Sequence, residues 1–400
     1  MSDDLYKLEI TDGQVVAFFE EDDGGWDQEY LSSNITFTVN TDGTVTFDKD
    51  KGGFHSLKTL SPTATLGVYA ETAKSYVLAD GTIVTQEPHD LNDDRDHDGF
   101  DDDDKDHDGS KDDRFDGNGD DDDYNGGAGD DNVNGGRGHD RLHGGAGYDR
   151  IDGGQGNDSI SGGYDDDSLF GGNQNDQLSG GNGDDRLSGG NGNDRLNGST
   201  GDDALGGGNG HDLFLETDNS GDDRYNGGTG TDTISYANVT GDVSADLSTG
   251  IATGDTIGAD RLLKIENLIG GAGNDTLGGN QAANKIVGGA GNDVIDGQGG
   301  NDKLYGGAGD DVLTGGAGRD KLYGGEGADT FVFATGSGRD DVRDFQNGID
   351  HLQITAGAAA FSDLAISQHG DDVVIAFADV RIVLDHTNAA LIDATDFIFG

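Results

Sequence analysis

The sequence predicts an all-β protein whose larger part is a stack of short strands repeated along the chain. From Gly126 to Leu215 the sequence repeats every nine residues, ten times in succession, and a second block of about seven units runs from Gly270 to Val332. Internal repeats of fixed length are typical of folds that stack one small unit on the next. Alternating apolar runs predict a small β-rich domain over residues 1–86 and a β-rich cap over residues 333–400.

Each unit follows the pattern G-G-x-G-x-D-x-U-x, in which U is a large apolar residue. Glycine allows the positive φ angles of a sharp turn, and the x-U-x triplet forms a short strand with U pointing inward. The eighth position is apolar throughout, from Val133 to Phe214 in the first block and from Leu277 to Phe331 in the second. Three units depart from the glycine pattern, at Asp165, Gln174 and Ser199.

The sixth position of the unit supplies a charged oxygen, and Ca²⁺ prefers six to eight oxygen ligands. Glu216 and Thr217 break the phase between the tenth unit and the two units that follow it. The unit that begins at Gly279 has Asn284 at its sixth position, so we expect a weakened or absent calcium site there. The predicted metal ligands of the repeats are Asp131, Asp140, Asp149, Asp158, Asp167, Asp176, Asp185, Asp194, Asp203, Asp212, Asp223, Asp232, Asp275, Asp293, Asp302, Asp311, Asp320 and Asp329.

The composition points to a chain that folds around cations. Asp and Glu number 80 against 24 Lys and Arg, the formal net charge is −56, and only 31% of the residues are hydrophobic. Charge this one-sided opposes compaction unless counterions enter the fold, so the chain is either disordered or stabilised by cations. The same charge excludes nucleic acid as a partner and disfavours anionic membrane surfaces. The absence of cysteine excludes disulfides and thiolate metal sites.

These repeats resemble the calcium-binding repeats of the repeats-in-toxin (RTX) family. The resemblance implies a right-handed parallel β-roll in which two nonapeptides make one turn, with several bound Ca²⁺ ions as the cofactor. It also implies that calcium binding drives folding. The alternative is a flexible linker rich in Gly and Asp. A linker, however, has no reason to hold aspartate and an aliphatic residue in phase through so many units.

Residues 236–269 separate the two repeat blocks, 126–235 and 270–332, and we expect them to continue the stack as a structural insertion. The segment ends in Ile265-Glu266-Asn267-Leu268-Ile269-Gly270, which resembles the stretch that leads into the next block in related rolls. Residues 333–400 resemble the carboxy-terminal cap and uncleaved secretion signal of type I exported members of the family. The start, Met1 to Tyr6, has no basic region and no apolar run, so we expect export through a type I secretion exporter rather than by a signal peptide.

Residues 87–125 form an acidic linker that contains a short internal repeat. The pattern D-x-D-x-D-G occurs twice and supplies further candidate calcium ligands, Asp94, Asp96, Asp98, Asp104, Asp106 and Asp108. This pattern opens an EF-hand loop, but the twelfth position is Lys105 in the first loop and Phe115 in the second, where an EF-hand has Glu. The loops look more like those of thrombospondin type 3 repeats. A solvated linker without calcium is the alternative.

The amino-terminal part carries no recognisable catalytic motif. Apolar alternation around Asp42-Gly43 and Asp80-Gly81 predicts two β-hairpins. Neither a zinc-protease H-E-x-x-H nor a nucleophile elbow G-x-S-x-G occurs in the sequence. The acidic pairs Glu20-Glu21 and Asp22-Asp23 are better explained as a surface loop than as a glycosidase pair. Trp26 with Tyr30 fits a core or hairpin role better than a sugar platform.

We therefore expect a secreted, extracellular or surface-associated calcium-binding protein without enzymatic activity, such as an adhesin, matrix or surface component. Its expected partners are calcium, a type I exporter and a cell-surface polysaccharide or matrix, with no membrane span. The alternative is a secreted enzyme, polysaccharide-modifying or hydrolytic, whose roll serves export and folding. A pore-forming toxin is disfavoured because no apolar amphipathic stretch precedes the repeats.

Overall fold

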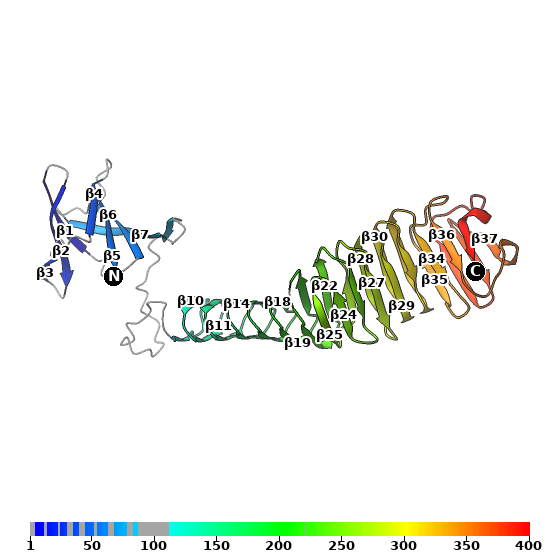
Figure 1. The fold of residues 1–400 in the computed structure, drawn as a ribbon, viewed down its shortest axis with the longest axis horizontal. Helices are drawn as coiled ribbons and strands as arrows, with labels where there is room; N and C mark the ends of the chain where they lie inside the picture. The colour runs from blue at the N-terminus through cyan, green and yellow to red at the C-terminus, as the bar shows by residue number, and fades with distance from the viewer. Residues whose placement is uncertain are drawn as a thin grey trace. The chain divides into compact units, whose positions relative to one another are not determined.

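The structure is a computed structural model that describes residues 112–219 and 221–400, together with the backbone of eight strands within residues 5–86. The chain divides into two compact units, Met1–Gly99 and Phe100–Gly400 (Figure 1). Helix in the described residues is limited to two 3-10 turns, Phe361–Asp363 and Ala394–Asp396. The prediction of an all-β fold is therefore confirmed. In the described part of the chain, no helix is long and apolar enough to serve as a membrane span.

The amino-terminal unit contains one antiparallel sheet, in the order β3-β2-β1-β7-β6-β5-β4, with β8 paired to β7. Both predicted hairpins form, because Val39 pairs with Val45 across β4 and β5, and Val77 pairs with Ile83 across β7 and β8. The strands are β1 (Leu5–Thr11), β2 (Gln14–Asp22), β3 (Gly25–Glu29), β4 (Ile35–Val39), β5 (Val45–Lys51), β6 (Phe54–Pro62), β7 (Val68–Val77) and β8 (Ile83–Gln86).

The second unit is built on two parallel ladders of short strands, which we call sheet 1 and sheet 2. Sheet 1 contains β10 (Asp123–Ala128), β12 (Arg141–Ala146), β14 (Ser159–Tyr164), β16 (Gln177–Asn182), β18 (Arg195–Thr200), β20 (Leu213–Thr217), β22 (Thr233–Asn238), β26 (Asn267–Ile269), β28 (Lys285–Ala290), β30 (Lys303–Ala308), β33 (Lys321–Glu326) and β35 (Arg339–Val342). Sheet 2 contains β9 (Arg114–Asp116), β11 (Asn132–Arg137), β13 (Arg150–Gln155), β15 (Ser168–Asn173), β17 (Arg186–Asn191), β19 (Ala204–Gly210), β21 (Arg224–Gly230), β27 (Thr276–Asn280), β29 (Val294–Gly300), β31 (Val312–Thr314), β32 (Ala317–Gly318), β34 (Thr330–Phe333) and β36 (His351–Ile354).

The register of both ladders matches two nonapeptides per turn. Leu142 of β12 pairs with Ile160 of β14, and Ile151 of β13 pairs with Leu169 of β15, so successive turns are offset by 18 residues. The eighth-position side chains of both blocks are no more than 3% exposed and belong to one apolar cluster. The predicted parallel β-roll is therefore confirmed, with its core between the two sheets.

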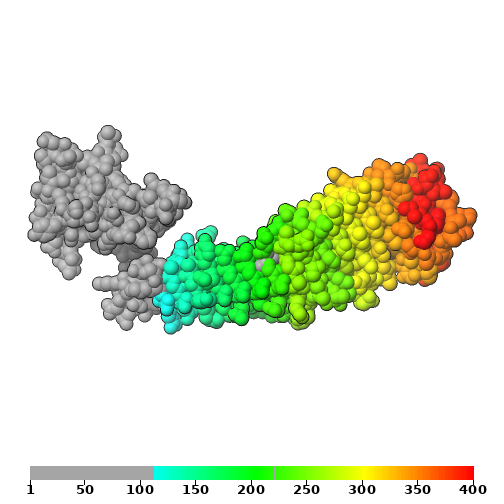
Figure 2. Space-filling view, in the orientation of Figure 1, coloured from blue at the N-terminus to red at the C-terminus, as the bar shows by residue number. Residues whose placement is uncertain are grey.

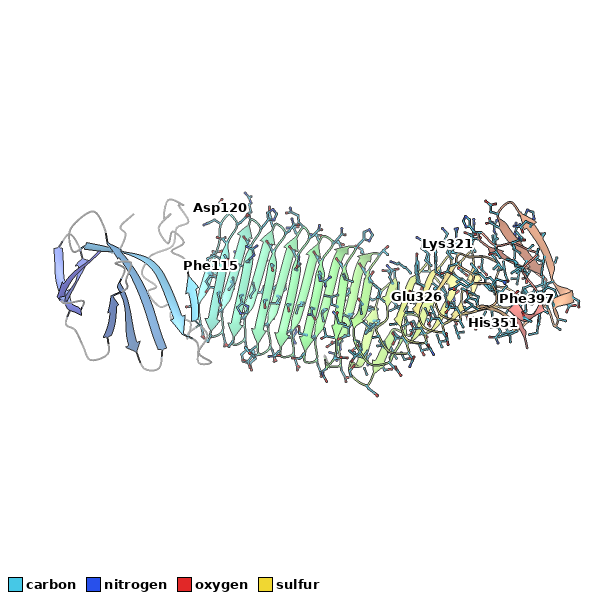
Figure 3. The ribbon with its side chains drawn as sticks, turned by 90° about the horizontal axis from the view of Figure 1, so that it is seen from above. Phe115, Asp120, Lys321, Glu326, His351 and Phe397 are labelled. Atoms are coloured by element: carbon cyan, nitrogen blue, oxygen red, sulfur yellow. The ribbon has the colours of Figure 1, made fainter. Side chains whose placement is uncertain are left out.

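The stack begins before the first complete repeat. Strand β9 pairs with β11 and places Phe115 beside Val133, although residues 87–125 had been expected to form a linker. Strand β10 likewise pairs with β12 and places Tyr124 beside Leu142. Phe115, labelled at this end of the roll in Figure 3, stacks on Tyr124 with the ring centroids 4.4 Å apart. An aspartate followed two residues later by an aromatic residue thus forms a rung even where glycines are missing.

The insertion interrupts only one of the two ladders. Sheet 1 passes directly from β22 to β26 and β28, because Leu268 pairs with both Ile234 and Ile286. In sheet 2 the chain adds an antiparallel segment made of β23 (Val243–Asp246), β24 (Ile251–Gly254) and β25 (Gly258–Leu263). Strand β25 pairs in parallel with β21, and β23 pairs in parallel with β27. The surface of the roll consequently runs on from the first block to the second (Figure 2).

The carboxy-terminal segment closes the apolar interior. Sheet 1 ends in β39 (Val380–Leu384), which pairs in parallel with β35 and antiparallel with β38 (Asp372–Phe377), and β37 (Ala365–His369) forms the edge. Sheet 2 ends in β40 (Phe397–Phe399), paired with β36. Ile375, Leu384 and Phe397 are buried and join the core cluster. A repeat stack exposes apolar surface at its ends unless an end segment covers it.

Candidate metal sites

Each sixth-position aspartate is buried and uses one carboxylate oxygen to hold a neighbouring turn. All the predicted aspartates of the repeats are 0–2% exposed. The backbone N–H of Asp131 donates to Oδ1 of Asp149 at 2.9 Å, and that of Asp167 donates to Oδ1 of Asp185 at 2.7 Å. The same bond recurs through the second block, as from Asp293 to Asp311 at 2.8 Å. One oxygen of each carboxylate is therefore a structural acceptor.

The other oxygen, Oδ2, has no hydrogen-bond partner within the described residues at most of these positions. It lies beside the first glycine of its own unit, where a Cβ built on Gly126 would be 1.9 Å from Oδ2 of Asp131 and 2.7 Å from the carbonyl oxygen of Gly144. Carboxylate and carbonyl oxygens thus converge on one small space. The predicted ligands with this orphaned oxygen are Asp131, Asp140, Asp149, Asp158, Asp167, Asp176, Asp185, Asp194, Asp203, Asp212, Asp293, Asp302, Asp311, Asp320 and Asp329.

The column of carboxylates is electrostatically unfavourable as it stands. Burial, together with the charges of neighbouring aspartates in the column, raises the pKa of Asp176 to about 8 and that of Asp167 to about 7. Burial likewise raises the pKa of Asp302 in the second block to about 7. A buried carboxylate with an unpaired oxygen is costly unless a cation or a proton compensates it. The donor set contains only oxygen, which is the chemistry that Ca²⁺ prefers.

Four sixth positions differ from the rest. Oδ2 of Asp223 accepts a hydrogen bond from the hydroxyl of Tyr225, and both oxygens of Asp275 accept backbone N–H groups, from Val243 and Gly271. Asp232 is buried and its Oδ1 accepts the N–H of Asp212 as in the other units, but its Oδ2 is not among the buried oxygens without a partner. The amide of Asn284 accepts from the N–H of Asn280 and donates to the carbonyl of Glu266. The weak site expected at Asn284 accordingly has a side chain engaged at both ends.

Three further aspartates have the same orphaned Oδ2: Asp122, Asp260 and Asp340. The sequence indicates a degenerate unit around Asp122 and Tyr124 before the first block, but sequence reasoning missed Asp260 and Asp340. Asp260 stands in a half-motif, G-x-D-x-U-x, that begins at Gly258 without the two leading glycines, and Asp340 stands in a unit that begins at Thr335 and lacks only the first glycine. A search for this half-motif would have found them. The linker candidates Asp94, Asp96, Asp98, Asp104, Asp106 and Asp108 lie outside the described residues, as do the side chains of Trp26 and Tyr30.

Comparison with known proteins gives matches along the repeats. A family model described as the RTX calcium-binding nonapeptide repeat matches residues 116–151, 125–160, 143–178, 179–214, 217–235, 265–295, 278–313, 296–331 and 305–341. No curated protein matches the chain.

Solved structures with similar segments include two bacterial proteins. The extracellular lipase LipA from Serratia marcescens is 21% identical with a TM-score of 0.22, and the match covers 61% of this chain but only 40% of the lipase. The AlgE6R2 subunit of the Azotobacter vinelandii mannuronan C5-epimerase is 32% identical with a TM-score of 0.25, over 30% of this chain and 89% of the subunit.

Proposed function

Because this chain belongs to the family of proteins with RTX calcium-binding nonapeptide repeats, we propose that it is a secreted protein whose roll binds several Ca²⁺ ions and folds as it does so. The observation that carries the proposal is the column of buried aspartates whose Oδ2 atoms lack a partner among the described residues. Bound calcium would supply positive charge at these oxygens. Without it, the folded chain would hold a row of desolvated like charges.

In this proposal the two oxygens of each carboxylate have different roles. Oδ1 fixes the backbone of the preceding turn, as Asp185 does for Asp167. Oδ2, together with a glycine carbonyl such as that of Gly144 near Asp131, would face the ion. Ligand contact and turn-to-turn contact therefore depend on the same side chain. Because each repeat contacts only its neighbours, filling one site would favour its neighbours and make folding cooperative.

Circular dichroism of the full chain tests the proposal directly. We expect loss of the β spectrum of the roll in excess chelator and its return in millimolar Ca²⁺, with Mg²⁺ at equal concentration as the control. A β spectrum of the full chain that is the same in excess chelator and in Ca²⁺ would contradict calcium-driven folding. The amino-terminal sheet contributes its own signal, so the difference between the two conditions is the quantity to compare.

We propose further that the protein leaves the cell through a type I exporter and acts outside it as an adhesin, matrix or surface component rather than as an enzyme. This proposal is supported by the positions of the buried carboxylates in the described residues, most of which lie at the sixth position of the repeat. A binding screen of the full chain against polysaccharides and cell surfaces, with and without Ca²⁺, tests the role. Turnover of a polysaccharide or ester substrate by the purified protein would instead support the secreted-enzyme alternative.

A further inference from the structure

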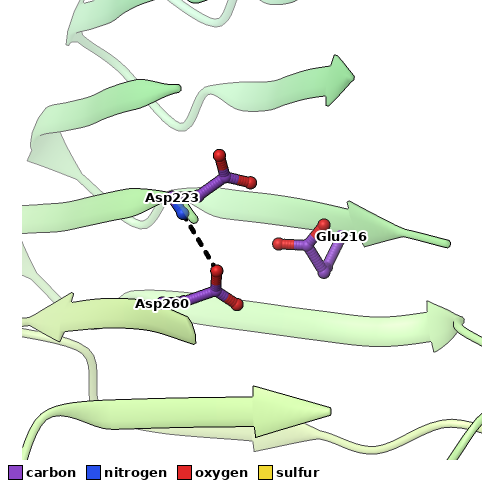
Figure 4. Close-up of side chains that lie close together, drawn as sticks. All are labelled: Glu216, Asp223 and Asp260. Atoms are coloured by element: carbon purple, nitrogen blue, oxygen red, sulfur yellow. Dashed lines mark hydrogen bonds between the residues drawn. The ribbon is translucent and has the colours of Figure 1, made fainter. Parts of the chain in front are cut away.

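Three buried carboxylates converge where the first repeat block meets the insertion. They belong to Glu216 in β20, Asp223 immediately before β21, and Asp260 in β25, and each residue is 1% exposed. One carboxylate oxygen from each lies within 4.8 Å of the others (Figure 4). The cluster therefore joins a strand of sheet 1 to two neighbouring rungs of sheet 2.

Glu216 stands where the repeat would place a glycine. Register brings Asn197 of β18 beside Leu215 of β20, so Glu216 follows Gly198 by one turn. A Cβ built on Gly198 would lie 2.0 Å from Oδ2 of Asp203. A glutamate in this place must consequently project toward the sixth-position aspartate, and the added residues at the phase break lengthen the step from Asp203 to Asp223 to 20 residues.

Hydrogen bonds account for only part of the polar atoms in this cluster. The hydroxyl of Tyr225 donates to Glu216 and also lies 3.0 Å from Oδ2 of Asp223, and the N–H of Asp223 donates to Oδ1 of Asp260 at 3.0 Å. Within residues 112–219 and 221–400, Oδ2 of Asp260 and the hydroxyl of Tyr236 have no hydrogen-bond partner.

Tyr236 independently indicates that this cluster binds a ligand. Its side chain is fully buried and follows Ser235 at the inward position where the repeat would again have glycine. The register places Tyr236 one turn after Glu216, because Leu215 pairs with Ser235. Burial and then the charges of Asp260, Glu216 and Asp223 raise the pKa of Tyr236 well above its usual value, in agreement with this position beside the cluster. A buried hydroxyl without a partner is costly, and so are three desolvated carboxylates.

We propose that Glu216, Asp223 and Asp260, with the hydroxyl of Tyr236, form an additional site for a hard divalent cation, Ca²⁺, inside the roll. The site differs from the repeat sites in its donors, because three carboxylates, from β20, β25 and the residue before β21, and a tyrosine replace one carboxylate and glycine carbonyls. The cation would offset the charge of the three carboxylates and give Oδ2 of Asp260 and Tyr236 a partner. It would also tie both sheets to the insertion at the point where sheet 2 is interrupted.

The first test counts bound ions on the full chain. Glu216→Gln keeps the size of the side chain and an acceptor for Tyr225 but removes the charge. We expect equilibrium dialysis at saturating Ca²⁺ to give one ion fewer per chain than in the wild type. Asp260→Asn should lose the same ion, and the double variant should again lose one, because both residues serve one site. Glu326→Gln, an exposed glutamate in β33, is the matched control and should lose none.

A second readout does not depend on counting many ions. Tb³⁺ bound beside a tyrosine is excited through the ring, so Tyr225 and Tyr236 should sensitise an ion in this site. We expect Glu216→Gln to lower the sensitised emission of Tb³⁺, and Tyr236→Phe, a milder change to the packing, to lower it as well.

The outcomes separate this inference from the proposed function. Equal ion counts and equal Tb³⁺ emission in wild type and Glu216→Gln would overturn the additional site, with protons shared among the carboxylates as the explanation. If the wild type bound no Ca²⁺ at all, the proposed function would fail as well. A loss of one ion in all three variants but not in Glu326→Gln supports the site.

Discussion

The backbone N–H of Asp131 donates a 2.9 Å hydrogen bond to the side chain of Asp149, one turn later in the roll. The carbonyl of Asp131 in turn accepts the N–H of Arg150 at 2.8 Å. Both backbone groups of a sixth-position residue are thus satisfied by the following turn. The aspartates are therefore part of the hydrogen-bond framework as well as candidate metal ligands, and substitutions can separate the two roles.

Asp302 offers such a separation in the second block. Asp302→Asn keeps an oxygen that accepts the N–H of Asn284, at 2.8 Å in the wild type, but loses the charge. We expect a higher calcium midpoint in a titration followed by circular dichroism. Asp302→Ala should be worse, because it also leaves a buried N–H unpaired, at a cost of about 1–3 kcal/mol. Asp94→Ala, in the linker, should change the midpoint least. Equal midpoints for the three variants would contradict this ranking.

Acid should partly replace calcium. Burial raises the pKa of Asp149 to about 6 and that of Asp203 to about 8, from an ordinary value of 3.8. Without metal, the folded roll therefore binds more protons than the unfolded chain, and its free energy of unfolding falls as pH rises. This stability is complete below about pH 3.8 and is lost through about pH 6 to 8.

Circular dichroism in excess chelator at a series of pH values checks the prediction. The β signal should increase as the pH is lowered from 8 to 5, and the calcium midpoint should rise over the same range because protons compete for the carboxylates. A β signal without metal that decreases toward pH 5 would show that burial does not raise the pKa of these aspartates in the folded roll. Sedimentation at each pH is the control for aggregation.

Asp165, Gln174 and Ser199 stand at glycine positions of the first block and hold strained backbone, because each has a positive φ. Gln174 has a φ of +77°, in the left-handed region that costs a residue with a side chain about 1–2 kcal/mol. We expect Gln174→Gly to raise the free energy of unfolding in Ca²⁺ by about 1 kcal/mol. Gly172→Ala is the opposite case, since its φ is +107° and a Cβ would lie 2.2 Å from the carbonyl oxygen of Gly154. Urea denaturation of both variants should give shifts of opposite sign.

Export should depend on the carboxy terminus rather than on the amino-terminal unit. Deleting Ser362 to Gly400 should leave the protein in the cytoplasm of a host that carries a type I system, whereas deleting residues 1–86 should not. The deletion also removes β37 to β40 and uncovers the core. Ile375→Asp, which places a charge at a fully buried position, is therefore the control: it should weaken the cap yet leave export intact. Secretion of the truncated chain would exclude a signal in this segment.

Most of the roll could be predicted from the sequence because its rule is local. The nine-residue period determines which positions form the turn, which supply the candidate metal ligands and which are buried. Leu142, Ile151 and Ile160, at the eighth position, are all buried as this rule predicts. Prediction failed where position is set by register across turns. Asp260 joins the aspartate column because β25 pairs with β21. Asp223 and Asp260 are 37 residues apart, a spacing that is not a multiple of the nine-residue repeat.

For the same reason, the sequence indicates Glu216 only as an interruption of the nine-residue repeat. Its closeness to Asp260 comes from the antiparallel segment that the insertion adds to sheet 2, which composition and spacing do not encode. The earlier start of the stack at Phe115 has a different cause. There the first and fourth positions are Asp108 and Lys111 in place of glycine, and β9 nevertheless pairs with β11.

The side chains of the repeats connect successive turns in both directions. At the sixth position the donor lies nearer the amino terminus, and the series ends where Asp320 and Asp329 donate to Asp340 and Asp350 of the cap at 3.1 Å. At the fifth position the donor lies nearer the carboxy terminus, as where the N–H of Tyr148 donates to Asp130 at 2.9 Å. A turn added at either end of the stack therefore finds side-chain acceptors for one of these two sets of N–H groups and supplies acceptors for the other, so neither end is favoured by hydrogen bonding alone.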